Sequence, residues 1–152
     1  MSCGRCGGRR EAAPPARALR VVLDPGVLVS ALLSPRGAPA RLYLLWLGGE
    51  FEMVVCPHLL EELEGVLRRP KLSDRVTPDE VEEFVEVIRR SAITVENPVI
   101  AEAVSRDPGD DYLVAVAQAA NVDYLVSGDK DLTSLAAVVP PVLSPAAFLD
   151  RL

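Results

Sequence analysis

Long uninterrupted apolar segments are absent from this sequence of 152 residues. No stretch approaches the roughly 18 consecutive apolar residues of a membrane-spanning helix. Residues 1–19 also lack the apolar segment of a secretory signal. We therefore expect a protein that does not contact a membrane and stays in the cytoplasm.

An excess of positive charge is missing as well, since the formal net charge is -6. Proteins that bind nucleic acid mainly by releasing phosphate counterions are usually basic. Simple polyanion binding is therefore disfavoured, and any contact with nucleic acid must be local. The candidate basic stretches for such a contact are Arg68, Arg69, Lys71 and Arg75, and Arg36 and Arg41, and both are more typical of a solvated charged face.

Cysteine is scarce, with three residues in the chain. Three cysteines do not make a disulfide framework. Cys3 and Cys6 have the spacing of half a zinc site, but no second pair follows, and Cys56 and His58 are the only other plausible ligands. We do not expect zinc. Neither G-x-x-x-x-G-K-[ST] nor G-x-G-x-x-G occurs, so nucleotide binding by these loops is unsupported.

The domain organisation follows from length and composition. Residues 1–18 are rich in Gly, Arg, Pro and Ala without an apolar period, which predicts a flexible tail or an over-extended start of the reading frame. The chain is 49% hydrophobic and 25% charged, the balance of a folded globular protein. A chain of this size closes one core. We expect one domain over residues 19–152.

Strand and helix patterns alternate along this domain. Short runs of β-branched and apolar residues predict strands at 19–23, 51–56, 93–95 and 124–127, and an edge strand within 138–143. Apolar positions at helical spacing predict helices at about 27–33, 38–47, 57–70, 78–91 and 112–120, with a helical turn at 132–135. Such alternation predicts an α/β/α protein, a mainly parallel sheet of about four to five strands covered on both faces.

Two helices carry specific signals. Thr77, Pro78 and Glu80 combine an N-cap hydroxyl, a proline at the first helical position and a glutamate at the third, which predicts a capping box. The helix at 112–120 is almost wholly apolar. Because it lacks a polar face, we expect it to be buried.

Acidic residues follow the predicted strands on one side of the sheet. In open α/β sheets, ligands bind beyond the carboxyl ends of the strands. Asp24 directly follows the first strand, and Asp129 lies just past the strand at 124–127. The helices that begin near Pro57 and Asp110 leave from the same edge. Four acidic segments are therefore expected to converge there.

The acid contributed by the helix at 57–70 is ambiguous. At about 100° per residue, Glu61 points away from the apolar stripe, whereas Glu62 and Glu64 lie on its opposite borders. Helix geometry alone does not separate Glu62 from Glu64.

Each acid also has an ordinary structural explanation. Asp107, Asp110 and Asp111 suit a helix start, because a carboxylate near a helix N-terminus caps it and complements its dipole. The functional interpretation depends on convergence. Several neighbouring carboxylates repel one another unless a cation joins them, and oxygen-only ligands suit Mg²⁺ or Mn²⁺. An acidic pocket without a metal would repel phosphate, so binding of nucleic acid there requires the metal.

With these residues in view, the sequence resembles the PIN domain family, in particular its VapC-like branch of toxin components of toxin-antitoxin systems. The resemblance covers about residues 19–152. Its order and spacing are fairly specific, and its segments are Val-Val-Leu-Asp at 21–24 with Val-Leu-Val-Ser-Ala at 27–31, Leu-Leu-Glu-Glu-Leu at 59–63, Arg-Asp-Pro at 106–108 leading to Asp-Asp-Tyr-Leu-Val-Ala at 110–115, and Tyr-Leu-Val-Ser-Gly-Asp-Lys-Asp-Leu at 124–132.

The resemblance implies a PIN-like three-layer fold and a catalytic, metal-binding quartet of acids: Asp24, Glu62, Asp111 and Asp129. It thereby favours Glu62 over Glu64. Asp131 is implied as an outer ligand, and Ser127 as the hydroxyl that orients the last aspartate. The implied activity is hydrolysis of RNA phosphodiesters assisted by Mg²⁺ or Mn²⁺, in which the ions bind the scissile phosphate and lower the pKa of a water nucleophile.

One departure bears on activity. Many PIN domains continue Asp-Thr-Asn after the first strand, whereas this chain has Asp24, Pro25 and Gly26. The departure removes a hydroxyl and a carboxamide. Contacts of this kind around metal ligands commonly change affinity or activity by roughly 10- to 100-fold.

Three functions are compatible with a carboxylate at the end of a parallel strand. The leading hypothesis is an endoribonuclease toxin, for which the resemblance implies an RNA substrate, a cognate antitoxin and a homodimer. The alternative is a catalytically weak PIN-like module that binds RNA or a protein partner, favoured by Pro25, Gly26 and the acidic charge. A response-regulator or phosphatase domain would also use an aspartate at a strand end. Glu62 and the Ser-Gly-Asp segment at 127–129 fit that class poorly.

Overall fold

The structure, a computed structural model, describes residues 18–99, 111–134 and 138–152, and the side chain of Asp111 lies outside the described part. Its centre is a sheet of five parallel strands in the order β3-β2-β1-β4-β5. The strands are β1 (Arg20–Leu23), β2 (Glu52–Val55), β3 (Ile93–Thr94), β4 (Tyr124–Val126) and β5 (Val142–Leu143). Helices flank the sheet, as the alternation of patterns predicted.

The strand order contains one reversal. The chain steps outward from β1 to β2 to β3, then returns past β1 to form β4 and steps outward again to β5. Right-handed crossovers place the helices of two opposite walks on opposite faces of a parallel sheet. The reversal between β1 and β4 is therefore the topological switch point, where ligands bind beyond the carboxyl ends of the strands.

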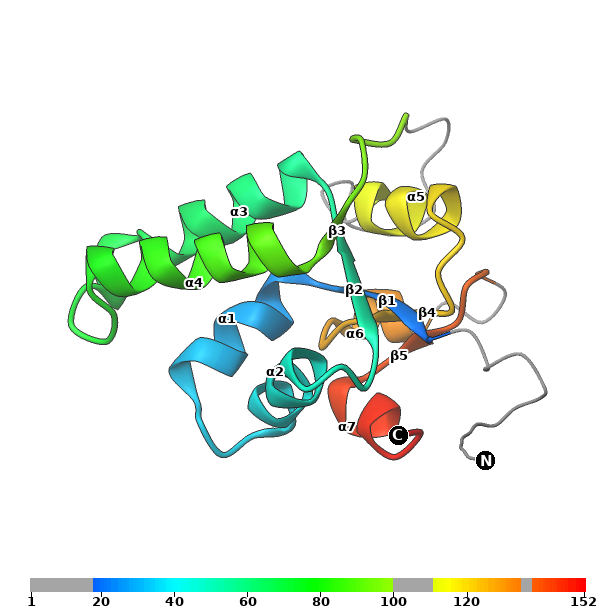
Figure 1. Cartoon of the computed structure of the whole chain (residues 1–152), viewed down its shortest axis with the longest axis horizontal. Coiled ribbons are helices and arrows are strands. Elements are labelled where there is room, and N and C mark those ends of the chain that lie inside the picture. Colours follow the sequence, from blue (N-terminus) through cyan, green and yellow to red (C-terminus); the bar gives the residue numbers. More distant parts are fainter. Residues whose placement is uncertain (1–17, 100–110, 135–137) are drawn as a thin grey trace, which may run out of the picture.

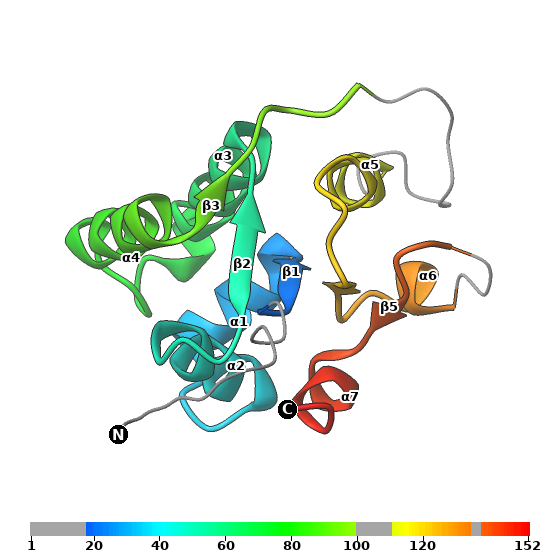
Figure 2. The ribbon, with the colours of Figure 1, turned by 45° about the vertical axis from the view of Figure 1, so that its right-hand side comes forward.

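The helices connect the strands in turn. They are α1 (Pro25–Leu33), α2 (Ala38–Leu47), α3 (Pro57–Leu67), the 3₁₀ turn η1 (Pro70–Leu72), α4 (Pro78–Ser91), α5 (Asp111–Ala119), α6 (Lys130–Thr133) and α7 (Pro145–Leu149). In both ribbon views α5 lies across the strands from α1 and α2, and α3 runs beside α4 (Figures 1 and 2). These helices form the outer layers of a three-layer α/β/α fold.

Burial explains the sequence of the central strands. Val21, Val22 and Leu23 are at most 1% exposed, because β1 is covered on both faces and paired on both edges. The predicted burial of α5 is confirmed, since Tyr112, Leu113 and most of the apolar residues that follow are buried. The core is thus continuous from the sheet into α5.

Helix starts agree with local chemistry. The Thr77 hydroxyl accepts from the Glu80 N–H at 3.1 Å, and the Glu80 carboxylate accepts from the Thr77 N–H at 2.8 Å, which confirms the capping box. Two helices begin two residues earlier than predicted, α1 at Pro25 and α6 at Lys130. In both, an aspartate expected only as a ligand also acts as the N-cap.

The described residues contain no helix long and apolar enough to cross a membrane. Residues 1–17, with Cys3 and Cys6, lie outside the described part, so the tail and the domain boundary at residue 19 stay predictions. Cys56 is a buried free cysteine at the N-cap of α3.

Candidate active site

Asp24 lies where β1 ends at the switch point. Its backbone N–H donates to the Val126 carbonyl of β4 at 2.9 Å, which joins the ends of the two strands. Its carboxylate caps α1, since Oδ1 accepts from the Gly26 N–H at 2.8 Å. Pro25 follows at the first helical position, where a missing N–H costs nothing. The sheet and the helix start together hold this carboxylate in one orientation.

Ser127 is the polar residue beneath the site. It is fully buried, directly after β4. Its hydroxyl donates to Oδ2 of Asp24 at 2.7 Å, and its Oγ accepts from the Asp129 N–H at 3.0 Å. Ser127 therefore binds the side chain of the first predicted aspartate and the backbone of the last.

Asp129 is the N-cap of α6. Its Oδ1 accepts from the Asp131 N–H at 2.8 Å, so the carboxylate is fixed by the helix it begins. Asp131, expected as an outer ligand, lies in the first turn of α6 and is not among the described residues that line the cleft below. Its described contact with the site is made through its backbone amide.

The two candidate glutamates of α3 take different surroundings. Glu62 lines the same cleft as Asp24 and Asp129, and its Oε1 accepts a hydrogen bond from the Tyr112 hydroxyl at 2.7 Å. Glu64 faces elsewhere, where it forms a surface ion pair with Arg68 at 2.9 Å. The structure thus brings Glu62, and not Glu64, to the carboxyl edge of the sheet.

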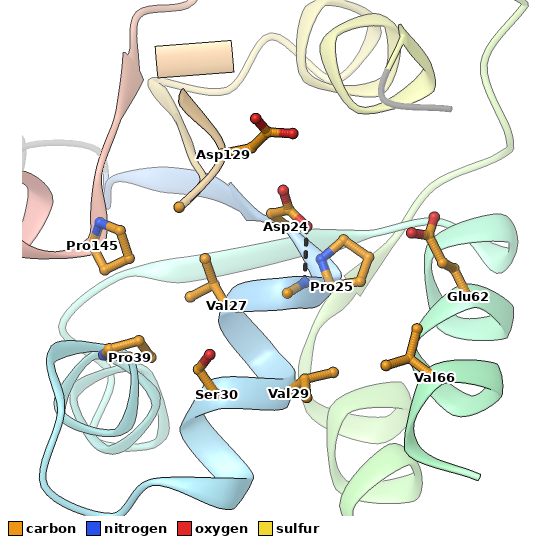
Figure 3. A pocket seen from close by; sticks show the side chains of 12 residues that line it. Asp24, Pro25, Val27, Val29, Ser30, Pro39, Glu62, Val66, Asp129 and Pro145 are labelled. Atoms are coloured by element: carbon orange, nitrogen blue, oxygen red, sulfur yellow. Dashed lines mark hydrogen bonds between the residues drawn. The ribbon is translucent and has the colours of Figure 1, made fainter. Parts of the chain in front are cut away.

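These acids share a cleft of about 480 Å³ between α1, α3 and the loop after β4. Figure 3 shows Asp24 between Asp129 and Glu62. The described lining residues contain three carboxylates and no Lys, Arg or His: they are Asp24, Pro25, Gly26, Val27, Val29, Ser30, Pro39, Glu62, Val66, Gly128, Asp129 and Pro145. The wall of the cleft is therefore anionic, and a phosphate could enter only together with cations.

The fourth predicted acid is only partly described. Asp111 is the first residue of α5, but its side chain lies outside the described part, as do Asp107 and Asp110. Among the described side chains, no three His, Cys, Asp or Glu residues are grouped closely enough to hold a metal ion. The metal-binding quartet therefore stays a prediction.

The donor chemistry of the cleft nevertheless fits a divalent cation. Its charged groups are carboxylates, the oxygen ligands that Mg²⁺ and Mn²⁺ prefer. A carboxylate has about four lone-pair positions, and the described hydrogen bonds occupy two on Asp24 and one each on Glu62 and Asp129. Each of the three retains lone pairs that could bind a metal.

Tyr112 is a residue that sequence reasoning missed, because it was treated only as part of an apolar helix. It is 4% exposed. Burial, followed by the hydrogen bond to Glu62 and that residue's negative charge, raises the pKa of the Tyr112 hydroxyl above its ordinary value of 10.0. The hydroxyl is thus protonated at neutral pH and donates. A buried tyrosine usually finds a hydrogen-bond partner, and this was the available signal.

Comparison with known proteins agrees with this architecture. An uncharacterized protein of Methanocaldococcus jannaschii, MJ1680, is 28% identical over 117 residues, which is 77% of this chain and 75% of the relative. Among solved structures, PAE2754 from Pyrobaculum aerophilum is similar with a TM-score of 0.64 and 17% identity, covering 90% of each chain.

A second solved structure is VapBC2 from Rickettsia felis bound to a DNA fragment from their promoter. It is similar with a TM-score of 0.54 and 10% identity, over 82% of this chain and 97% of that one. At these identities the two solved structures support the fold. The PIN domain family itself matches residues 20–131, which include Asp24, Glu62, Asp111 and Asp129. The chain belongs to the PIN domain family.

Proposed function

We propose that this protein is a metal-dependent endoribonuclease, the toxin component of a toxin-antitoxin system in the cytoplasm. One observation carries the proposal: Asp24, Glu62 and Asp129, which come from three separate elements, line a single anionic cleft at the switch point. Capping alone would explain Asp24 and Asp129, but not the presence of Glu62 beside them. PIN domains are generally nucleases, and family membership supports this activity.

Asp24, Glu62 and Asp129 would hold Mg²⁺ or Mn²⁺, together with Asp111 at the start of α5. A bound divalent ion supplies Lewis-acid chemistry, which stabilises charge on a phosphodiester and lowers the pKa of an attacking water. The residues of the chain orient these ligands. Ser127 and the Gly26 N–H fix Asp24, the Asp131 N–H fixes Asp129, and Tyr112 fixes Glu62.

The partners are part of the proposal. An RNA strand is the substrate, and a cognate antitoxin would mask the cleft and keep the enzyme inactive. A similar structure is of VapBC2, which supports a partner of this kind. The protein is proposed to act as a homodimer. Co-expression with the product of a neighbouring gene, followed by size-exclusion chromatography, would test both assemblies.

Activity is tested on the purified full chain with a fluorescent single-stranded RNA that carries a quencher. Cleavage should require Mg²⁺ or Mn²⁺ and stop in EDTA. Glu62→Gln should reduce the rate by 100-fold or more, on the order of losing one metal ligand together with its charge. Glu64→Gln is the matched control, since it changes the same group on the same helix but at the surface pair with Arg68.

Two outcomes would contradict the proposed nuclease activity. Equal cleavage rates for Glu62→Gln and Glu64→Gln would show that any RNA cleavage observed does not depend on the carboxylates of this cleft. An inert wild-type protein at high Mn²⁺ on many RNAs, with RNA or a partner still bound, would favour the alternative of a catalytically weak binding module. The replacement of the common Thr-Asn pair by Pro25 and Gly26 is the observation that supports that alternative.

A further inference from the structure

Tyr112 joins two helices at the edge of the candidate site. It is the second residue of α5, and its hydroxyl donates to Oε1 of Glu62 on α3 at 2.7 Å. The tyrosine is almost fully buried, whereas Glu62 is exposed. An exposed glutamate has three rotatable side-chain bonds and ordinarily samples several rotamers. The hydrogen bond from a buried donor restricts Glu62 to one of them.

The ring of Tyr112 is held as firmly as its hydroxyl. His58 lies one helical turn before Glu62 on α3, so both residues face the same side of that helix. The rings of His58 and Tyr112 pack edge to face, with centroids 4.3 Å apart and planes at 85°. The His58 N–H in turn donates to Oδ1 of Asn97 at 2.8 Å, which ties the first turn of α3 to the segment after β3. The donor of the bond to Glu62 is therefore rigid.

We propose that Tyr112 is a positioning residue that presents the Glu62 carboxylate to a divalent metal ion. This inference rests on the proposed metal-dependent function. With Oε1 engaged by Tyr112, the other oxygen of Glu62 is available to a cation in the cleft. Because Tyr112 directly follows Asp111 in the chain, the same contact fixes the start of α5, which carries the fourth predicted acid, relative to α3.

The competing explanation is that Tyr112 only fills the core and its hydroxyl merely finds a partner. Tyr112→Phe distinguishes the two, since it keeps the ring, the contact with His58 and the burial but removes the donor. Tyr124→Phe is the matched control. Tyr124 packs on Phe148, its hydroxyl accepts a hydrogen bond from Arg151 at 3.1 Å, and neither Tyr124 nor Arg151 is among the described residues that line the cleft.

Mn²⁺ affinity is measured by isothermal titration calorimetry on the full-length proteins. Tyr112→Phe should raise the Kd for Mn²⁺ by roughly 10- to 100-fold, the usual effect of removing a contact that orients a metal ligand. Tyr124→Phe should leave the Kd within about twofold of wild type, the level expected when an interaction does not couple to the site. Both variants should stay folded, as shown by unchanged far-UV circular dichroism.

A second measurement needs no metal. In the metal-free protein, the ¹³C resonance of the Glu62 carboxyl carbon, assigned by its disappearance in Glu62→Gln, should move towards the position of a freely rotating glutamate in Tyr112→Phe and stay unchanged in Tyr124→Phe. A resonance that does not move would overturn the proposal.

The outcomes separate this inference from the proposed function. If wild type binds Mn²⁺ and Tyr112→Phe binds it equally well, the role of Tyr112 is wrong while the nuclease stands. If wild type binds neither Mn²⁺ nor Mg²⁺, the proposed metal-dependent function is wrong, and the role assigned to Tyr112 is wrong with it.

Discussion

Ser127→Ala perturbs the most buried polar group near the site, because Ser127 is 0% exposed. The change removes a hydrogen bond of 2.7 Å to Oδ2 of Asp24 and leaves the Asp129 N–H without its acceptor at 3.0 Å. A hydrogen bond to a charged group contributes about 1.5 to 3 kcal/mol, and a neutral one about 1 kcal/mol. Asp24 and Asp129 are half-buried, so in the variant water replaces part of the hydrogen bonding that Ser127 supplied. We expect the free energy of unfolding to fall by about 2 to 4 kcal/mol.

The assay is urea unfolding followed by circular dichroism, in EDTA so that no bound metal adds to stability. For a chain of this size the loss corresponds to a fall in Tm of roughly 5 to 15 °C. Ser30→Ala is the matched control. Ser30 lines the same cleft but is exposed within α1, so its replacement should change stability by less than about 0.5 kcal/mol.

A loss below about 1 kcal/mol for Ser127→Ala would refute the reasoning, since the hydroxyl would then not hold the Asp24 carboxylate. The expected result is a fall in the urea midpoint at constant m-value. A change in the m-value would instead show that the variant altered the compactness of the native or the denatured state.

Two further predictions concern Gly26 and the tyrosines. A Cβ at Gly26 would meet only Oδ1 of Asp24, at an ordinary 3.5 Å, so Gly26→Asn should fold normally. Its Mn²⁺ affinity, measured by calorimetry, should change by less than about tenfold, which is well short of the full effect of losing a contact that orients a metal ligand. Burial is the main cause that raises the pKa of both Tyr43 and Tyr112, and the negative charge of Glu83 or the hydrogen bond to Glu62, respectively, adds to it. Both tyrosines should therefore ionise above pH 10.0 in a titration followed at 295 nm. Because the folded-state pKa values lie above the unfolded ones, their contribution to stability is complete below pH 10.0 and is lost as pH rises towards the folded values. Ionisation of Tyr43 and Tyr112 at pH 10.0 in the folded protein would contradict this.

Much of the fold could be predicted from the sequence because its signals are local. The runs that form β1 and β2 are apolar on both faces, the capping box marks Thr77 and Glu80, and the apolar stripe of α3 gives its period. The two helix starts that differed from the prediction, at α1 and α6, are positions at which one aspartate serves two purposes. The pattern identifies the residue but does not show that it begins the helix.

The site was predictable only in part, because its contacts join distant segments. Ser127 lies 103 positions from Asp24, and Tyr112 lies 50 positions from Glu62. No periodicity encodes such pairs. The choice between Glu62 and Glu64 shows the same limit: both border the apolar stripe of α3, and only the packing of α3 against α1 and α4 gives them different surroundings.

Pro25 and Gly26, which depart from the common Thr-Asn pair, have a structural explanation in the start of α1. Proline suits the first position of a helix, and the Gly26 N–H binds Oδ1 of Asp24 through the backbone, which any residue supplies. Oδ2 of the same carboxylate is bound by Ser127. Both oxygens of Asp24 are therefore oriented without help from the side chains at positions 25 and 26. The missing hydroxyl and carboxamide would then reduce contacts to water or substrate in the cleft but would not change the orientation of Asp24. For this reason we expect only a modest change in Mn²⁺ affinity for Gly26→Asn.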